Sequence, residues 1–362
     1  MSKRSFRTAL AVVIGSVLLI IGIAGWFVHR AFAYPDDPHA GAGTEIEVEI
    51  KPGMGIQPVA ALLAHKHVID RPTWFRLYAM WEGDTTNIKP GKYLLKDNQT
   101  PAQVLHTLIT GVKEVTIKVT IPEGRNMLEV FAILQQAKVA SAKDLEQVAR
   151  DKEFLGRHAI TGDTVEGYLF PDTYEFRINE KPRAVLDRLV IHHEEVWNDL
   201  LAHHGRDAAK LKDKLHWSDR DILTMASIVE KEAVDPKERP RIAQVFINRL
   251  IQPTFKPHRL ETDPTIRYGC EVPTQKSAAC QQWNPGDRLH RAQLDDADNP
   301  YNTYQHEGLP PGPICNPGRA SLEATLAPDG SEYLYFVAKD ARNHVFARTL
   351  EEHKKNVARF MH

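Results

Sequence analysis

The hydrophobic and polar positions divide the chain into an apolar N-terminal run and a long body of short, patterned segments. Residues 8–28 carry no charged side chain and consist mostly of Ala, Val, Leu, Ile and Gly. In a helix these residues rise about 1.5 Å each, which is enough to cross a hydrocarbon core of about 30 Å. The pattern therefore predicts a transmembrane helix.

Charges on either side of this run predict its orientation. Lys3, Arg4 and Arg7 precede it, whereas Arg30 follows it and two aspartates come soon after. The positive-inside bias keeps the short N-terminus in the cytoplasm and sends the body outward. The alternative is a cleaved signal peptide, because residues 31–33 have the small-x-small form. The length of the apolar run favours an uncleaved anchor over residues 1–33.

The first part of the body has the pattern of a small α+β unit. A segment rich in Pro, Gly, Ala and Asp predicts a linker over residues 34–44. Alternation of apolar and polar positions, and apolar spacings of three and four, then predict strands at 44–50 and 92–95 and helices at 59–65, 73–81 and 100–109. This order resembles a LysM-like glycan-binding module, and it defines a subdomain over 45–113.

The second part of the body, residues 114–362, continues as α+β. We predict a strand at 115–121, helices at 127–136, 142–151, 183–214 and 218–233, and an aromatic, proline-broken loop at 166–174. The expected fold is therefore a transmembrane helix, a LysM-like α+β subdomain and a larger α+β catalytic domain.

The helix predicted over residues 218–233 carries candidate acid–base groups. Ser218 has the position of an N-cap, and Asp221 stands where a carboxylate completes a capping box. Ile222, Met225, Ala226 and Val229 form an apolar stripe, and Glu230 lies about 60° from its centre. Partial burial of a carboxyl group disfavours its charged form, as a general acid at neutral pH requires. Glu232 lies on the opposite flank, and periodicity alone does not separate the two.

Ordered sequence blocks resemble one enzyme family. Residues 226–233 read ASIVEKEA, and the other blocks are IPEG at 121–124, EGYLFPDTY at 166–174, VFINRL at 245–250, ETDPTIRYG at 261–269, YNTY at 301–304, GLPPGPI at 308–314, YLYFV at 333–337 and HVF at 344–346. Together they resemble the MltG (YceG-like) family of endolytic murein transglycosylases, with the core motifs over 218–350. Residues 269–294 look longer than the family pattern, and their role stays open.

The resemblance implies the site residues. It makes Glu230 the catalytic acid and base, and it suggests substrate binding by Thr262, Asp263, Tyr301, Asn302 and Tyr304. For Asp263 the alternative is a turn-forming residue before a proline. For the tyrosine-rich loop, contact with sugar rings and an N-acetyl group stands beside simple packing.

The resemblance also implies the function. We expect a peptidoglycan lytic transglycosylase, a lyase that cleaves MurNAc–GlcNAc bonds of nascent strands, forms 1,6-anhydro ends and acts as a terminase of polymerisation. It would be a single-pass protein of the cell inner membrane with a periplasmic catalytic domain, and peptidoglycan synthases are expected partners. A non-catalytic glycan-binding scaffold of the cell-wall synthesis machinery is the alternative.

Composition and motifs argue against nucleic-acid binding, a metal site and a cofactor. The 46 basic and 47 acidic residues nearly cancel, so no charge field indicates nucleic acid. No H-E-x-x-H motif or cysteine pair at zinc spacing occurs, and no phosphate-binding glycine loop, so we expect neither a metal nor a cofactor. A Cys270–Cys280 disulfide is one interpretation of the three cysteines, with Cys315 free; three buried thiols are the other.

Overall fold

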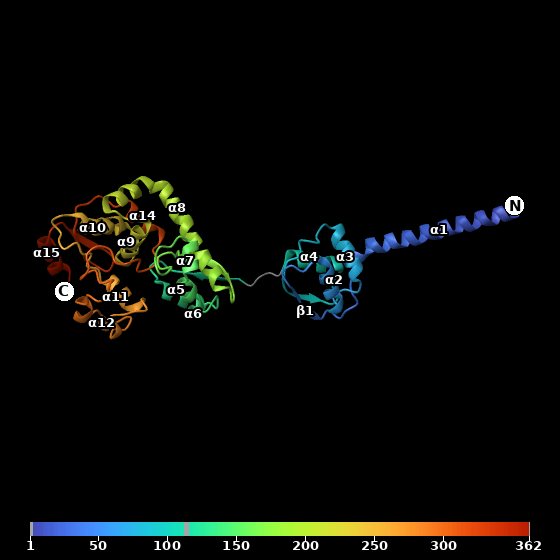
Figure 1. The fold of residues 1–362 in the computed structure, drawn as a ribbon, viewed down its shortest axis with the longest axis horizontal. Helices are drawn as coiled ribbons and strands as arrows, with labels where there is room; N and C mark the ends of the chain where they lie inside the picture. Colours follow the sequence, from blue (N-terminus) through green and yellow to red (C-terminus); the bar gives the residue numbers. More distant parts are fainter. Residues whose placement is uncertain (1–2, 112–115, 362) are drawn as a thin grey trace. The chain divides into compact units, whose positions relative to one another are not determined.

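The chain folds as two units, each a mixture of helices and small antiparallel sheets. The computed structural model describes residues 3–111 and 116–361, with the side chains of the first helix from residue 16 onward. The units are Met1–Glu114 and Val115–His362. The domain boundary expected between residues 113 and 114 lies outside the described residues. The predicted mixed helix-and-sheet class is confirmed, and Figure 1 shows the elements of each unit.

The expected N-terminal apolar helix is present as α1, Lys3–Ala33. Within the part of the chain that the structure describes, one segment, Ser16–Asp36, is long and apolar enough to cross a membrane. Its apolar side chains, from Val17 to Phe32, are exposed. Apolar side chains exposed over so many successive helical residues are typical of a segment that lipid surrounds.

The rest of the first unit follows the predicted order of strand, two helices, strand and helix. Its elements are β1 (Glu45–Ile50), α2 (Ile56–His65), α3 (Pro72–Trp81), β2 (Gly91–Lys96) and α4 (Pro101–Thr110). The strands pair antiparallel, with Glu45 opposite Lys96. Val48 and Ile50 face the core together with Tyr93 and Leu95, so each strand buries alternate residues.

Residues 34–44, expected as a linker, are held against this unit. Tyr34 is buried in the core and begins a short 3-10 helix, η1 (Tyr34–Asp36). Asp97 Oδ1 accepts hydrogen bonds from the backbone N–H groups of Gly43 and Thr44, at 2.7 and 2.9 Å. A buried aromatic ring and a satisfied carboxylate make this segment part of the folded unit rather than a free spacer.

The second unit is mostly helical, with two pairs of antiparallel strands. Its elements are β3 (Thr116–Thr120), α5 (Met127–Gln136), α6 (Ala142–Ala149), α7 (Lys152–Arg157), β4 (Thr173–Arg177), α8 (Pro182–Leu215), α9 (Asp219–Glu232), η2 (Pro236–Glu238), α10 (Arg239–Ile251), α11 (Asp263–Glu271), α12 (Ala278–Gln281), α13 (Arg291–Leu294), α14 (Arg319–Leu326), β5 (Tyr335–Ala338), β6 (His344–Ala347) and α15 (Leu350–Phe360). Strand β3 pairs with β4, and β5 pairs with β6.

Helix α9 is the buried centre of this unit, packed with α10 and α14 (Figure 1). The sequence predicted one apolar stripe, but every residue from Ile222 to Val229 is buried. Polar positions tolerate this burial because their hydroxyl groups are satisfied. Thr224 Oγ1 donates to the carbonyl of Arg220 at 2.8 Å, and Ser227 Oγ donates to that of Thr224 at 2.7 Å.

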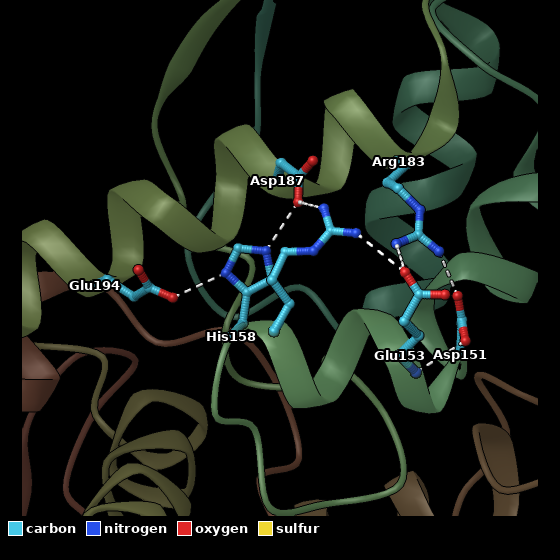
Figure 2. Close-up of polar contacts among 7 residues, drawn as sticks. Asp151, Glu153, His158, Arg183, Asp187 and Glu194 are labelled. Carbon is cyan, nitrogen blue, oxygen red and sulfur yellow. Dashed lines mark hydrogen bonds and ion pairs between the residues drawn. The ribbon is translucent and has the colours of Figure 1, made fainter.

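A charged network fastens the short helix α7 to the long helix α8 (Figure 2). The ring of His158, at the end of α7, lies between two carboxylates of α8, with Nε2 2.8 Å from Asp187 and Nδ1 2.9 Å from Glu194. Arg183 of α8 reaches back to Asp151, 2.5 Å away, and to Glu153. These pairs hold the start of α8 against α7.

Candidate active site

Glu230 stands near the C-terminal end of α9, where the helix leaves the core. The predicted capping box is confirmed, since the Ser218 side chain accepts from the Asp221 N–H and Asp221 accepts from the Ser218 N–H. The cap fixes where α9 begins, and the helix then carries Glu230 to a nearly buried place, with 6% of its side chain exposed. A carboxylate so enclosed needs specific partners.

Three groups contact the two carboxylate oxygens of Glu230. Oε2 accepts hydrogen bonds from Ser321 Oγ at 2.7 Å and from the backbone N–H of Gly318 at 3.1 Å. Oε1 accepts from Nη2 of Arg239 at 3.3 Å. Gly318 and Ser321 belong to the start of α14, whereas Arg239 begins α10. Glu230 is therefore oriented by the helix that follows α9, α10, and by α14, which is remote from α9 in sequence.

A second carboxylate, Glu123, shares Arg239 with Glu230. Its Oε2 lies 3.6 Å from Arg239 Nη2. Partial burial and the nearby Glu230 carboxylate raise the pKa of Glu123, while Arg239 opposes the shift. Gly318 leaves room for this group, because a Cβ atom at Gly318 would collide with the Glu123 carboxylate. The two acids and one guanidinium form a compact constellation.

The sequence interpretation had not singled out Glu123, Arg239 or Ser321. Glu123 stands in the IPEG block, where a proline and a glycine shape a turn. Gly124 adopts φ +74°, a conformation that glycine tolerates best. Its carbonyl oxygen accepts a hydrogen bond from Lys231 Nζ at 3.1 Å, which joins the turn to α9. That glycine-bearing turn was the available signal, although nothing in the sequence pattern indicates which helix it meets.

A buried acid, Glu166, holds in place the segments that surround Glu230 and Glu123. Glu166 Oε2 accepts from the backbone N–H of Met127 at 3.0 Å, and Oε1 accepts from the Asn316 side chain at 3.1 Å. The backbone carbonyl oxygen of Asn316 also accepts a hydrogen bond from the backbone N–H of Gly124 at 3.0 Å. Asn316 precedes Gly318 by two residues. Burial raises the pKa of Glu166 to about 8, and the hydrogen bonds offset this only in part. Glu166 thus positions the segment that binds Glu230.

Glu232 occupies a different environment from Glu230. It accepts a hydrogen bond from the Thr262 hydroxyl. Burial raises the pKa of Glu232, and the Thr262 hydrogen bond opposes the shift. The two glutamates that periodicity treats alike therefore face separate neighbourhoods.

Three of the expected substrate-binding residues gather near Glu232 rather than at the Glu230 carboxylate. Thr262 is buried and stands at the N-cap position of α11, whose first residue is Asp263, although its side chain makes no capping hydrogen bond. The sequence placed Asp263 in a loop, but the proline that follows it fits the first turn of a helix. Asp263 is exposed and accepts a hydrogen bond from the Tyr304 hydroxyl at 2.9 Å.

Asn302 is fully buried in the tyrosine-rich loop. Its Nδ2 lies 3.1, 3.2 and 2.8 Å from the carbonyl oxygens of Gln293, Leu294 and Asp296, and its Oδ1 accepts from the Tyr304 N–H at 3.0 Å. This is the packing arrangement that the sequence left open as one alternative. Contact of Asn302 with substrate stays a prediction.

Tyr301 is half-buried beside an open cavity. Its ring packs against Tyr268 with the centroids 4.8 Å apart. The cavity, of about 410 Å³, is also lined by Arg150, Thr161 and Arg220. An aromatic side chain and hydrogen-bonding groups around an open cavity are suited to a polar ligand.

The long segment at residues 269–294 is braced by a disulfide. Cys270 and Cys280 are joined, as one of the two sequence interpretations expected, and Cys315 is a buried free thiol. Ile266 and Trp283 pack around the bridge as a small separate core. Among the described side chains, no group of three His, Cys, Asp or Glu residues has the arrangement of a metal site.

Comparisons with known proteins agree on one family. The family model described as the YceG-like family matches residues 48–359. An endolytic murein transglycosylase of Bacillus subtilis is 30% identical over 326 residues, which cover 86% of this chain and 84% of that protein. A protein of the same name from Streptococcus pneumoniae D39 is 25% identical over 345 residues, and the match spans 58% of its length. The crystal structure of a yceG-like protein from Listeria monocytogenes has a TM-score of 0.54 and 31% identity, covering 86% of this chain and 98% of that one.

Proposed function

Because the chain belongs to the YceG-like family, we propose that it is an endolytic peptidoglycan lytic transglycosylase with Glu230 as its acid and base. The observation that carries this proposal is the enclosure of the Glu230 carboxylate by Arg239, Gly318 and Ser321 beside a second carboxylate. Such an oriented carboxyl group is what proton transfer at a glycosidic oxygen requires.

The reaction needs one carboxyl group that acts first as a general acid and then as a general base. Protonated Glu230 first donates its proton to the glycosidic oxygen between MurNAc and GlcNAc, and the bond from the MurNAc C1 to that oxygen breaks. The Glu230 carboxylate then accepts the proton of the MurNAc C6 hydroxyl, whose oxygen bonds to C1 and closes a 1,6-anhydro ring. No water is consumed, so a second carboxylate for activating water is unnecessary.

The neighbours of Glu230 have separate parts in this cycle. Ser321 and Gly318 hold Oε2, so Oε1, which also accepts from Arg239, is the oxygen that would exchange the proton. Arg239 and Glu123 form an ion pair at the edge of the site, where 49% of the Glu123 side chain is exposed. Glu123 is therefore an acidic group beside Glu230 that is partly open to solvent.

Substrate contacts are proposed at two places. Tyr301 borders the cavity of about 410 Å³, where a sugar ring can stack. Asp263 and Tyr304 form an exposed hydrogen-bonded pair that can bind sugar hydroxyl groups. Thr262 and Asn302, both buried, would act by shaping the loops that carry these groups.

The N-terminal part suggests where the enzyme works. Helix α1 anchors the chain in the cell inner membrane, with the N-terminus in the cytoplasm and the catalytic unit in the periplasm, as the flanking charges favour. The α+β part of the first unit would be LysM-like and bind glycan. Cleavage beside the membrane would end nascent strands, so peptidoglycan synthases are the partners proposed.

Mass spectrometry of products from purified murein tests the proposal. The enzyme should release 1,6-anhydro-MurNAc ends in the presence of a chelator. Reducing ends would indicate a hydrolase, and activity lost with the chelator would indicate a metal-dependent enzyme. If the protein binds murein without releasing product, the alternative of a non-catalytic glycan-binding scaffold is the right one.

A further inference from the structure

The first unit carries exposed apolar side chains on α3 beside the end of the anchor helix. Leu77, Met80 and Trp81 are 51, 58 and 73% exposed, although soluble domains rarely gather large apolar groups on one exposed helix face. We call these three residues the α3 patch. Phe75 and Ala79 on the same helix are buried, so the helix is seated in its unit and presents the patch outward.

The α3 patch is continuous with the exposed surface of α1. Phe27 stacks on Trp74, with ring centroids 6.3 Å apart, and Phe32 makes an edge contact with Trp81 at 5.4 Å. Between the two helices lies a cavity of about 380 Å³, lined mostly by apolar and aromatic side chains that include Leu77. Anchor and patch therefore present one joined apolar surface.

The depth of the patch in a bilayer follows from the anchor. The uncharged run starts at residue 8, and about 20 helical residues cross the hydrocarbon core, which then ends near Phe27. Phe32 lies five residues farther, about 7.5 Å along the helix, at the outer limit of a headgroup layer about 5–7.5 Å thick. Side chains that touch Phe27 and Phe32 consequently lie at the depth of the lipid headgroups.

We propose that α3 is a membrane-contacting helix, and that the α3 patch is inserted into the interface of the same bilayer that α1 crosses. Tryptophan and other amphipathic aromatic side chains favour this layer. The inference depends on α1 crossing a bilayer and not on the catalytic chemistry.

Apolar insertion, rather than charge, holds the patch in the membrane. Arg71 and Arg76 are close in sequence to the patch, but Glu82 and Asp84 follow it. Balanced charges of this kind produce no net attraction to anionic lipid. Binding to zwitterionic and to anionic vesicles should therefore be equal.

Vesicle binding of residues 34–362 tests the patch without the anchor. This fragment keeps its fold, since the core of the first unit begins at Tyr34 and uses none of the α1 side chains that the structure describes. It should sediment with pure phosphatidylcholine vesicles. The double variant Leu77→Gln, Trp81→Gln should bind at least about 10-fold more weakly, because two interfacial apolar groups are lost.

The matched control is Leu94→Gln. Leu94 is an exposed leucine of the same unit, at 68%, but it lies on β2. This variant should bind vesicles as the unaltered fragment does. Failure of the unaltered fragment to bind pure lipid, or an equal loss in the Leu94 variant, would overturn the proposal. If the unaltered fragment does not bind pure lipid, the α3 patch would instead be a surface for binding another protein.

Fluorescence quenching in the full chain, inserted in vesicles, provides an independent test of the depth of the α3 patch. A Leu77→Cys variant is labelled selectively with a fluorophore, because Cys270 and Cys280 are bridged and Cys315 is buried. Lipids carrying a quencher near the headgroup should quench this probe and spare the same probe at Leu94→Cys. Equal quenching at both positions contradicts an insertion specific to α3.

Discussion

Replacing Glu230 by glutamine removes the proton that the proposed mechanism transfers, while the shape of the side chain is kept. The amide oxygen can still accept hydrogen bonds from Gly318 and Ser321. The amide NH₂ group then faces the guanidinium of Arg239, which is also a donor. The substitution is therefore nearly isosteric but not neutral.

The substitution should have two separate effects, one on the stability of the protein and one on the rate of the reaction. Losing one hydrogen bond to a charged group costs about 1.5–3 kcal/mol of stability, out of the 5–15 kcal/mol typical of a domain. Losing a general acid lowers the rate by about 10²–10⁴-fold, which corresponds to roughly 2.7–5.4 kcal/mol of activation free energy. The variant should remain almost fully folded and yet be inactive.

The assay measures anhydro-muramyl ends released from murein, together with a urea unfolding curve for each protein. Glu232→Gln is the control. Glutamine can accept the hydrogen bond from Thr262 and resembles the neutral form that burial favours at Glu232. This control should keep its fold and most of its activity.

Two results would refute the assignment. If Glu230→Gln cleaves murein normally and Glu232→Gln does not, the acid lies on the other flank of α9. If both variants are active, the single-carboxylate mechanism does not apply to this protein, and Asp263 becomes the residue to test.

Three other predictions concern the surroundings of the site. Gly318→Ala should lower activity by displacing the Glu123 carboxylate, and combining it with Glu123→Ala should cost no more than Glu123→Ala alone, as activity assays of the three variants can check. Since the folded-state pKa of Glu166 is raised to about 8, the unfolded state loses this proton first, and stability should fall by about 2–3 kcal/mol between pH 5 and pH 7. Glu166→Gln should flatten that slope in urea titrations, and an unchanged slope would exclude Glu166 as its source. Mass spectrometry of protein exported to an oxidising compartment should find Cys270 linked to Cys280, and two alkylatable thiols would contradict the bridge.

Local pattern was sufficient for most elements of the chain. The apolar run, the strand order of the first unit and the capping box of α9 were all predicted, because period and capping chemistry depend on residues close in sequence. The ordered motif blocks were sufficient for the family as well. Local pattern was less reliable for burial. Helix α9 was expected to be amphipathic, but its residues from Ile222 to Val229 are buried on every side, since the hydroxyl groups among them donate to backbone carbonyl oxygens of the same helix.

Only the tertiary structure distinguishes the environments of Glu230 and Glu232. Along the sequence both are glutamates on the edges of one apolar stripe. In the fold, Glu230 meets Arg239 and the start of α14, beside Glu123 from a turn 107 residues earlier, whereas Glu232 meets Thr262. Periodicity specifies the face of a helix on which a side chain lies, but its electrostatic partners arrive through long-range packing. Those partners, not the helix itself, distinguish the proposed acid, Glu230, from Glu232.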